Sequence, residues 1–318
     1  MNNLVTVFGG SGFVGRYIVQ RLAKKGIRVR VATRRPNEAI FLKTYGVVGQ
    51  IEPVLCNIRD EDSVRSVMLG ADAVINCVGI LESNGKNKFN SVQNLGADRV
   101  SRIASELGVS RMVHVSAIGA DINSRSEYAR TKALGEESVL KNFPLAIILR
   151  PSIIFGVEDD FFNRFGAMAR LSPVLPIVGG KTNFQPVYVD DVAEAVVLGA
   201  VSNIDPGIYE LGGPVVASFS ELMDQMLKEI MRRRLVINLP FWLGFMMGTS
   251  FDIIKAVFLG LIKGPITKDQ VINLQKDNIV SGDLKTFKDL GINPTSLEII
   301  LPTYLWKFRP SGQFSELK

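Results

Sequence analysis

Apolar and polar positions alternate along the first half of the chain in a way that predicts strands and helices in turn. Leu4 to Phe8 is a short apolar, β-branched run, and residues 16–24 then carry apolar side chains at helical spacing. The later predicted strands are 28–32, 51–56, 73–78, 111–115 and 146–149, and the helices between them end at Tyr45 or cover 61–69, 90–107 and 128–141. Such alternation predicts an α/β, Rossmann-type fold, a doubly wound parallel sheet with helices on both faces.

Glycines directly follow the first predicted strand. Gly9, Gly12 and Gly15 have G-x-x-G-x-x-G spacing between that strand and the first helix. Glycine lets the backbone turn tightly and approach a pyrophosphate at a helix N-terminus, where free N–H groups and the helix dipole favour an anion. We therefore predict dinucleotide binding at this turn, with Ser11, Phe13 and Val14 among the contacts; an ordinary tight turn is the alternative.

The second predicted strand should end beside the adenosine ribose of such a ligand. It is followed by Thr33, Arg34 and Arg35, where an NAD-binding protein would carry an acidic residue for the 2′-hydroxyl. Guanidinium groups pair with a 2′-phosphate through forked hydrogen bonds and stack on adenine. The sequence therefore favours NADP(H) over NAD(H), and the competing interpretation is a solvated basic turn.

The regular alternation stops after Pro151. Gly and Pro become frequent between residues 156 and 186, and a helix follows at 190–200. We expect a dinucleotide-binding domain of residues 1–156 plus about 185–202, and a smaller, mostly C-terminal substrate or partner domain of residues about 157–184 plus 203–318.

Tyr128 and Lys132 stand four residues apart in a predicted helix and so share one of its faces. A neighbouring ammonium stabilises a phenolate and lowers the pKa of the tyrosine, which makes Tyr128 a candidate proton donor or acceptor beside a nicotinamide. The same spacing also occurs in simple surface pairs on helices.

These motifs together resemble the extended and atypical short-chain dehydrogenase/reductase family, in its NAD(P)-dependent epimerase/dehydratase branch. After the glycine turn, Asn76 to Gly79, Asn94, Ser116 and the Tyr128/Lys132 pair come in the family's order, and residues 150–156, 187–193 and 207–213 match further segments. The likeness covers about residues 3 to 215.

The resemblance implies a role for each matched position. Gly9, Gly12 and Gly15 would hold the pyrophosphate, Arg34 with Arg35 the 2′-phosphate, Asn57 and Ile58 the adenine, Val78 and Gly79 the ribose and nicotinamide side, Lys132 the nicotinamide ribose, and Pro151, Ser152 and Ile153 the nicotinamide, with Asn94 also at the cofactor. The implied catalytic residues are Tyr128, Lys132 and Ser116. Ser116 departs from the pattern, because Ala117 and Ile118 stand where the family's hydroxyl is expected.

A narrower likeness covers residues 114–120, 128–136, 151–159, 185–191, 266–271 and 290–298. These segments are similar to the NAD(P)H-binding accessory subunits of respiratory complex I and their bacterial relatives, whose nucleotide is regarded as structural and which lie near the membrane and the quinone site. The resemblance implies an accessory or assembly role in complex I or a ubiquinone-linked process. The alternatives are an active oxidoreductase or epimerase on a small carbonyl, sugar-nucleotide or quinone-precursor substrate, using Tyr128 and Lys132, and a nucleotide-sensing regulator.

Composition excludes several kinds of chemistry. Two cysteines, Cys56 and Cys77, and a single histidine are too few for a disulfide framework or a Cys- or His-rich metal site, so we expect no metal. His114, within a β-branched strand, is expected to be a buried, hydrogen-bonded, neutral imidazole. The start of the chain lacks the pattern of a secretory signal, and we expect a cytoplasmic protein without a nucleic-acid partner.

The net charge of +6 lies mostly in the last part of the chain, since 13 basic and 8 acidic residues occur from Lys228 onward. The same part holds an apolar run from Phe241 to Ile262, which a helix could use to span a membrane, but Asp252 and Lys255 in its middle would each cost about 2.5–3.5 kcal/mol there. An interfacial or quinone-side element and ordinary core stay open. Arg232 to Arg234 precede it as a solvated helix end or a contact for anionic lipid, so residues 232–262 are candidates for peripheral contact with the cytoplasmic face of the inner membrane.

Overall fold

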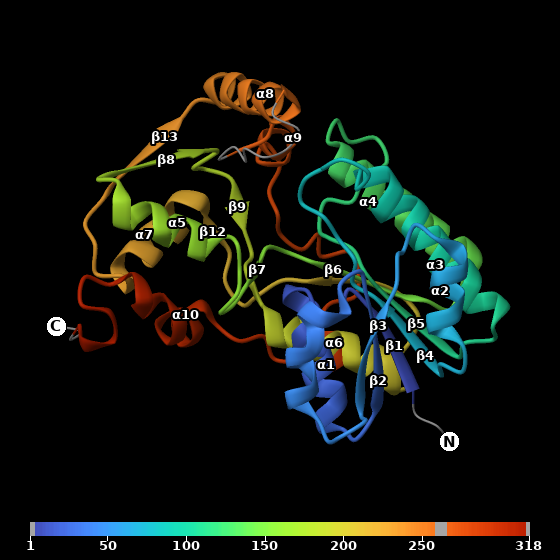
Figure 1. Cartoon of the computed structure of the whole chain (residues 1–318). Helices are drawn as coiled ribbons and strands as arrows, with labels where there is room; N and C mark the ends of the chain where they lie inside the picture. Colours follow the sequence, from blue (N-terminus) through green and yellow to red (C-terminus); the bar gives the residue numbers. More distant parts are fainter. Residues whose placement is uncertain (1–3, 258–265, 316–318) are drawn as a thin grey trace. The chain divides into compact units, whose positions relative to one another are not determined.

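The computed structural model describes residues 4–257 and 266–315, without the side chains of 253–257. It divides into two compact units (Figure 1). Unit 1 comprises Met1–Pro151, Val189–Leu211 and Ser281–Asn293, and unit 2 comprises Ser152–Tyr188, Gly212–Val280 and Pro294–Lys318.

Unit 1 is built on a seven-stranded sheet whose neighbouring strands pair in parallel. Its order is β11-β6-β5-β4-β1-β2-β3, with the bounds β1 (Leu4–Phe8), β2 (Arg28–Thr33), β3 (Ile51–Leu55), β4 (Ala73–Asn76), β5 (Arg111–Val115), β6 (Ile147–Pro151) and β11 (Gly207–Leu211). The strand order reverses between β1 and β4, and open α/β sheets bind their ligands beyond the carboxyl ends of the strands at such a point. The predicted Rossmann-type class is confirmed.

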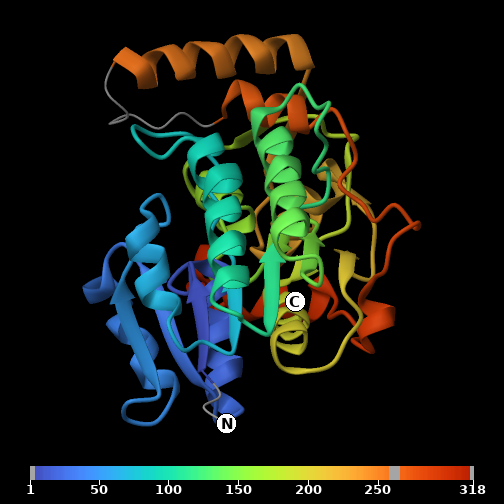
Figure 2. The same ribbon diagram turned by 90° about the vertical axis from the view of Figure 1, so that its right-hand side faces the viewer.

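Helices cover both faces of this sheet (Figures 1 and 2). One face carries α1 (Phe13–Lys24) and α6 (Val189–Val201), and the other carries α2 (Glu61–Met68), α3 (Leu95–Glu106) and α4 (Glu127–Asn142). The Arg21 guanidinium fastens α1 to α6 through two hydrogen bonds of 2.7 and 2.9 Å to the Asp190 carboxylate.

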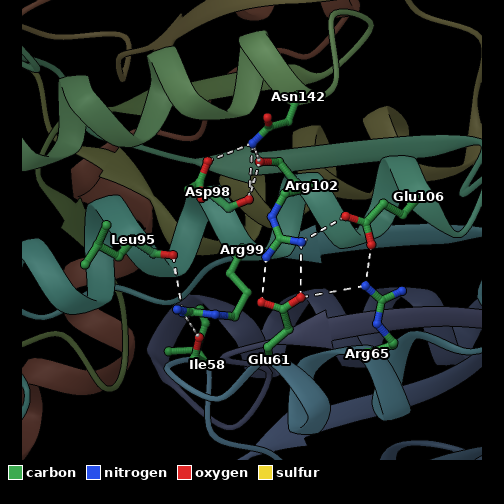
Figure 3. A network of polar contacts seen from close by, with 10 residues as sticks. Ile58, Glu61, Arg65, Leu95, Asp98, Arg99, Arg102, Glu106 and Asn142 are labelled. Carbon is green, nitrogen blue, oxygen red and sulfur yellow. Dashed lines mark hydrogen bonds and ion pairs between the residues drawn. The ribbon is translucent and has the colours of Figure 1, made fainter.

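A polar network joins the outer helices of the second face (Figure 3). On α3, the Arg102 guanidinium bonds to Glu61 of α2 at 2.7 Å and to Glu106 at 2.9 Å, and Arg65 of α2 also pairs with Glu106. Asn142 of α4 donates to the Asp98 carboxylate of α3 at 2.9 Å. Because these groups are largely solvated, they orient the helices more than they stabilise them.

Two predicted helices differ in their winding. The segment that ends at Tyr45 was expected as an ordinary helix after a polar turn, but it forms a 3₁₀ helix, η1 (Pro36–Tyr45). Only Ala39 and Leu42 of this segment are buried, and three residues per turn put them on the same side. The helix predicted for 90–107 begins with a π-helical turn, η2 (Asn90–Asn94), before α3.

The expected boundaries of the two domains differ from the units at four places. Residues 152–156 and 185–188 were expected in the dinucleotide-binding domain but belong to unit 2. We expected residues 203–318 in the smaller domain, but β11 and the segment 281–293, with η3 (Phe287–Leu290), belong to unit 1. The strand β11 pairs with β6 over its whole length, and Glu210 of β11 accepts a hydrogen bond from the Ser281 N–H. Because the paired residues are far apart in the sequence, no local sequence pattern reveals which unit these segments join.

Unit 2 packs around an aromatic cluster formed by Phe161, Phe165, Phe184 and Phe219, with ring centroids 5.4 to 6.2 Å apart. Its elements are β7 (Ile154–Phe155), α5 (Phe162–Leu171), β8 (Val174–Val178), β9 (Asn183–Phe184), β10 (Val187–Tyr188), β12 (Ala217–Ser218), α7 (Phe219–Glu229), β13 (Leu235–Leu239), α8 (Phe241–Val257), α9 (Lys268–Asn273), α10 (Leu297–Leu305), η4 (Trp306–Phe308) and η5 (Gly312–Phe314). No helix within residues 4–257 and 266–315 is both long and apolar enough to cross a membrane.

A buried carboxylate anchors α10 within unit 2. The Tyr304 hydroxyl of α10 donates to Asp159 Oδ2 at 2.5 Å, and the Gly156 N–H donates to the same oxygen at 3.1 Å. Burial raises the pKa of Asp159, while these hydrogen bonds act in the opposite direction. The carboxyl group therefore depends on its donors to remain in the core.

The substitution Tyr304→Phe should lower the free energy of unfolding by about 1.5–3 kcal/mol, because it removes a hydrogen bond to a buried acid without opening a cavity. Urea unfolding followed by circular dichroism measures the loss. The matched control is Tyr45→Phe, since the Tyr45 hydroxyl bonds to none of the described residues and its removal should be neutral. Equal stability of the two variants would contradict this account of Asp159.

Candidate functional site

The glycine turn brings the start of α1 onto the end of β1. The Gly12 N–H bonds to the Gly9 carbonyl at 3.0 Å, and a Cβ at Gly15 would lie 2.2 Å from that same carbonyl oxygen, so no side chain fits there. Gly12 is the N-cap of α1; no side chain caps the helix, and its first turn contains no acid. An uncapped helix start with close backbone approach suits an anion such as a pyrophosphate.

Two arginines follow β2, and only one of them forms an ion pair with a described carboxylate. The Ser11 hydroxyl of the glycine turn lies 3.2 Å from the Thr33 hydroxyl, which places this strand end beside the turn. The Arg35 guanidinium bonds to Glu38 at 2.9 Å, whereas exposed Arg34 has no carboxylate partner among the described residues. Arg34 is therefore the guanidinium that is available to an external anion.

The residues predicted at the adenine lie in a loop held by hydrogen bonds. Asn57 Oδ1 accepts from the Arg59 N–H at 3.2 Å, and the Asn57 N–H donates to the Ser63 hydroxyl at 3.0 Å. The Ile58 carbonyl accepts from Arg99 of α3 at 2.9 Å. Both predicted residues thus follow β3 in a fixed conformation at the carboxyl edge of the sheet.

The segment after β4 lies against the end of β1. Cys77 donates from both its N–H, at 3.0 Å, and its Sγ, at 2.9 Å, to the Phe8 carbonyl, and the Val78 N–H donates to Asn76 Oδ1 at 3.2 Å. Burial raises the pKa of the Cys77 thiol to about 12, so this sulfur stays protonated. Val78 and Gly79 are therefore set beside the glycine turn.

Lys132 of α4 reaches the same place from the other side. Its side chain is only 5% exposed, its Nζ donates to the Val115 carbonyl at 3.1 Å, and a Cβ built on Gly79 would lie 3.7 Å from Nζ. Burial lowers the pKa of Lys132 to about 8, against an opposing effect of Glu136. Of the three ammonium N–H donors, one bonds to a described residue, which leaves two for ribose hydroxyls.

The other proposed catalytic groups lie on the same two elements. Tyr128 stands one turn before Lys132 on α4, and its ring meets Phe89 edge-on with centroids 5.9 Å apart. Ser116 follows β5, and its N–H bonds to the Leu149 carbonyl at 2.7 Å. Its hydroxyl is buried and bonds to no other described residue, so its hydrogen-bonding capacity is unused.

The four remaining predicted cofactor residues are Asn94, Pro151, Ser152 and Ile153, and they lie outside the turn and strand ends described above. The Asn94 amide is occupied, because its Nδ2 donates to Asn90 at 2.8 Å and its Oδ1 accepts from Ser138 at 3.4 Å. Pro151 ends β6, opposite Leu211. Ser152 and Ile153 belong to unit 2, where the Ser152 hydroxyl and the Ile153 N–H bond to Asn278 Oδ1 at 2.7 and 2.9 Å.

Sequence reasoning missed one residue that organises the site. Gln93, fully buried in η2, donates to the Ile80 carbonyl at 2.8 Å and accepts from the Thr131 hydroxyl at 2.8 Å. It therefore ties the chain that follows Gly79 to the helix turn before Lys132. The signal available in the sequence was a polar side chain on the apolar face of a predicted helix.

The residues at this edge of unit 1 fit a nicotinamide dinucleotide. The glycine turn leaves room for a pyrophosphate, Arg34 offers a charge at the ribose end of β2, and Lys132 keeps ammonium donors at the ends of β4 and β5. The roles assigned to single residues remain predictions.

Comparison with known proteins agrees with this chemistry. Residues 5–212 match the model of the NAD dependent epimerase/dehydratase family. The chain is similar to NADH dehydrogenase (ubiquinone) 1 alpha subcomplex subunit 9, mitochondrial, of Arabidopsis thaliana, with 35% identity over 97% of this chain and 79% of that protein. The protein of the same name from Mus musculus is 33% identical over 93% of this chain and 78% of its own length.

Solved structures share the fold at low identity. The NADPH-dependent quinone oxidoreductase QOR2 of Escherichia coli, complexed with NADPH, superposes with a TM-score of 0.72 at 17% identity, covering 95% of this chain and 98% of that one. UDP-glucose 4-epimerase of Thermus thermophilus, in complex with NAD, gives 0.68 at 19% identity and covers 97% and 99%. On the strength of the match over residues 5–212, this chain belongs to the NAD dependent epimerase/dehydratase family.

Proposed function

We propose that this chain is an NADP(H)-binding accessory or assembly subunit of respiratory complex I, the NADH:ubiquinone oxidoreductase, or acts in a closely linked ubiquinone process. The observation that carries the proposal is the extent of the likeness: similarity to a complex I subunit covers 97% of the chain and so includes unit 2. A similarity confined to unit 1 would have indicated only that the chain binds a nicotinamide nucleotide. The bound nucleotide serves mainly to stabilise unit 1.

The choice of NADPH rests on Arg34. Its guanidinium is exposed and has no carboxylate partner among the described residues, while Arg35 is already paired with Glu38. A dianionic 2′-phosphate gains a forked, charge-assisted contact there that a 2′-hydroxyl does not. No acid of the kind that binds the ribose of NAD follows β2 directly.

Contact with the cytoplasmic face of the inner membrane is proposed for a surface that we call the basic apolar ridge: Arg233, Leu235, Ile237, Trp242 and Met246. The neighbouring Arg232 and Arg234 turn inward and donate to the Phe308 and Ala169 carbonyls. Arg233 is left exposed, followed by exposed Leu235 and Ile237 at alternate positions of β13.

The helix α8 adds two exposed side chains to this ridge, because its glycines face the rest of unit 2 and its larger residues face outward. A Cβ at Gly244 would lie 2.9 Å from Val178, and one at Gly248 would lie 2.7 Å from the Lys268 nitrogen. Trp242 and Met246 are 64% and 59% exposed. Exposed aromatic and apolar side chains on an element that follows an exposed cation suit the headgroup region of an anionic membrane, and a quinone tail is the alternative occupant.

The decisive experiment is purification of the tagged chain from its native membranes at native expression level. We expect complex I subunits to co-purify and release of the nucleotide with neutral organic solvent to yield about one NADP(H) per chain, with little exchange on washing. A chain that never co-purifies with those subunits contradicts the accessory role. Rapid NADPH oxidation with carbonyl or quinone substrates, abolished by Tyr128→Phe, would establish the catalytic alternative instead.

The substitution Arg34→Ala should weaken NADPH binding roughly tenfold to a hundredfold and leave NADH binding within about twofold, because only the 2′-phosphate loses a charged partner. Arg35→Ala is the matched control and should change neither affinity by more than about threefold, since its guanidinium already pairs with Glu38. Isothermal titration calorimetry with NADPH and with NADH measures these affinities. Equal losses for NADPH and NADH in Arg34→Ala would refute the assignment.

The substitution Trp242→Gln should weaken sedimentation with vesicles containing anionic phosphatidylglycerol about tenfold or more, through loss of buried aromatic area. The control is Phe314→Gln, which removes an aromatic ring outside the ridge that is even more exposed, at 82% against 64% for Trp242. Binding of wild type to neutral vesicles should be weak, because Arg233 then lacks its counter-charge. Equal binding of the two variants would exclude the ridge as the lipid contact.

A further inference from the structure

The single histidine of the chain lies inside unit 1, next to residues that the proposed function uses. His114 of β5 and Asn76 of β4 are directly paired in the sheet register, and both are almost completely buried. Asn76 Nδ2 and His114 Nδ1 are 3.2 Å apart, which is a hydrogen bond between neighbouring strands. The expectation of a buried, hydrogen-bonded imidazole is confirmed.

The direction of this hydrogen bond is fixed by the backbone. Asn76 Oδ1 accepts from the Val78 N–H at 3.2 Å, so the amide must turn its Nδ2 toward the histidine. An amide nitrogen only donates, and His114 Nδ1 must therefore accept. In a neutral ring the proton then lies on Nε2, an atom that bonds to none of the described residues.

A charged ring is incompatible with this arrangement. If His114 Nδ1 carried a proton, its N–H would point at the Asn76 Nδ2 amino group, and two hydrogen-bond donors would face each other. Rotation of the Asn76 amide would relieve this conflict but would break the hydrogen bond from the Val78 N–H. The nearby charge is the Lys132 ammonium of α4, and the nearby Cys77 thiol stays protonated, so neither favours an imidazolium. Burial and Lys132 accordingly lower the pKa of His114 to about 3.

The imidazole connects both strand ends that face the nicotinamide half of the dinucleotide. On β4 it acts through Asn76 on the Val78 peptide, which precedes Gly79. On β5 the next residue, Val115, supplies the carbonyl that holds Lys132 Nζ. We propose that His114 is a positioning residue of the nucleotide site, a neutral latch between β4 and β5 that fixes the Val78 peptide and lets Lys132 stay charged beside it.

This inference deepens the proposed function and rests on it, because Val78 and Lys132 need to be positioned only for a bound nucleotide. Loss of the acceptor at Nδ1 would leave the Asn76 amide with a buried, unsatisfied donor and free it to rotate. The Val78 N–H would then lose its own partner. The cost would appear in nucleotide affinity as well as in stability.

Nitrogen NMR tests the latch without any nucleotide. Because the sequence contains one histidine, imidazole-15N labelling gives one pair of ring signals that needs no assignment. We expect a proton on Nε2 and no titration between pH 8 and pH 5. In Asn76→Asp, the new carboxylate should draw the proton to Nδ1 and raise the pKa of the ring. A wild-type ring protonated on Nδ1, or one that titrates near the ordinary pKa of about 6.5, overturns the proposal.

Paired substitutions test the positioning role. His114→Leu should weaken NADPH binding about tenfold, since it removes the acceptor. His114→Asn, which places an amide oxygen close to the former Nδ1, should restore the affinity to within about threefold of wild type. Circular dichroism checks that both variants fold. Wild-type affinity in a folded His114→Leu overturns the positioning role.

A second comparison decides the matter if His114→Leu does not fold. His114→Gln carries the same amide as His114→Asn, but one methylene farther from the strand and therefore beyond Asn76. We expect NADPH binding about tenfold weaker in His114→Gln than in His114→Asn, and equal affinities overturn the latch. If wild type binds no NADP(H), the proposed function fails and the positioning role with it, whereas the Nε2–H state of the ring remains separately measurable.

Discussion

The nucleotide-binding edge of unit 1 depends on one steric constraint, the close approach of the Gly15 backbone to the Gly9 carbonyl. A Cβ at Gly15 would lie 2.2 Å from that oxygen, so the turn between β1 and α1 can close only around a glycine. Its closure brings the uncapped start of α1 to the point where the strand order reverses. The end of β4, held to Phe8 through Cys77, and Lys132 of α4 then complete the surroundings of the site.

Buried polar groups in unit 1 fall into two kinds. Arg150 and Glu136 form paired hydrogen bonds of 2.9 and 2.5 Å, and Glu210 lies 4.0 Å from the same guanidinium, so these charges satisfy one another. At the ends of β4 and β5, by contrast, Ser116 Oγ and His114 Nε2 bond to none of the described residues, and Lys132 uses one of its donors. Satisfied charges belong to the scaffold, whereas the incompletely satisfied groups gather where the nucleotide site is predicted.

Local periodicity predicted most of unit 1. The run from Leu4 to Gly15 and the Tyr128/Lys132 helix are local patterns, and the strands and helices around them were confirmed. What the sequence could not reveal depends on distant partners: the pairing of β11 with β6, the Gln93 bridge, and Asn278 beneath Ser152. The same limit applies to charges. Nothing local distinguishes Arg34 from Arg35, or Arg233 from its inward-facing neighbours, before their partners in space are known.

The exposed apolar side chains of α8 affect the stability of unit 2. Its glycines are used for close packing, and Trp242 and Met246 on its outer face stay 64% and 59% exposed, so they gain only part of their hydrophobic free energy when the chain folds. The remaining free energy would be gained only when the proposed membrane or partner surface covers Trp242 and Met246. If the proposed contact forms, unit 2 will therefore be more stable when bound than as the isolated chain.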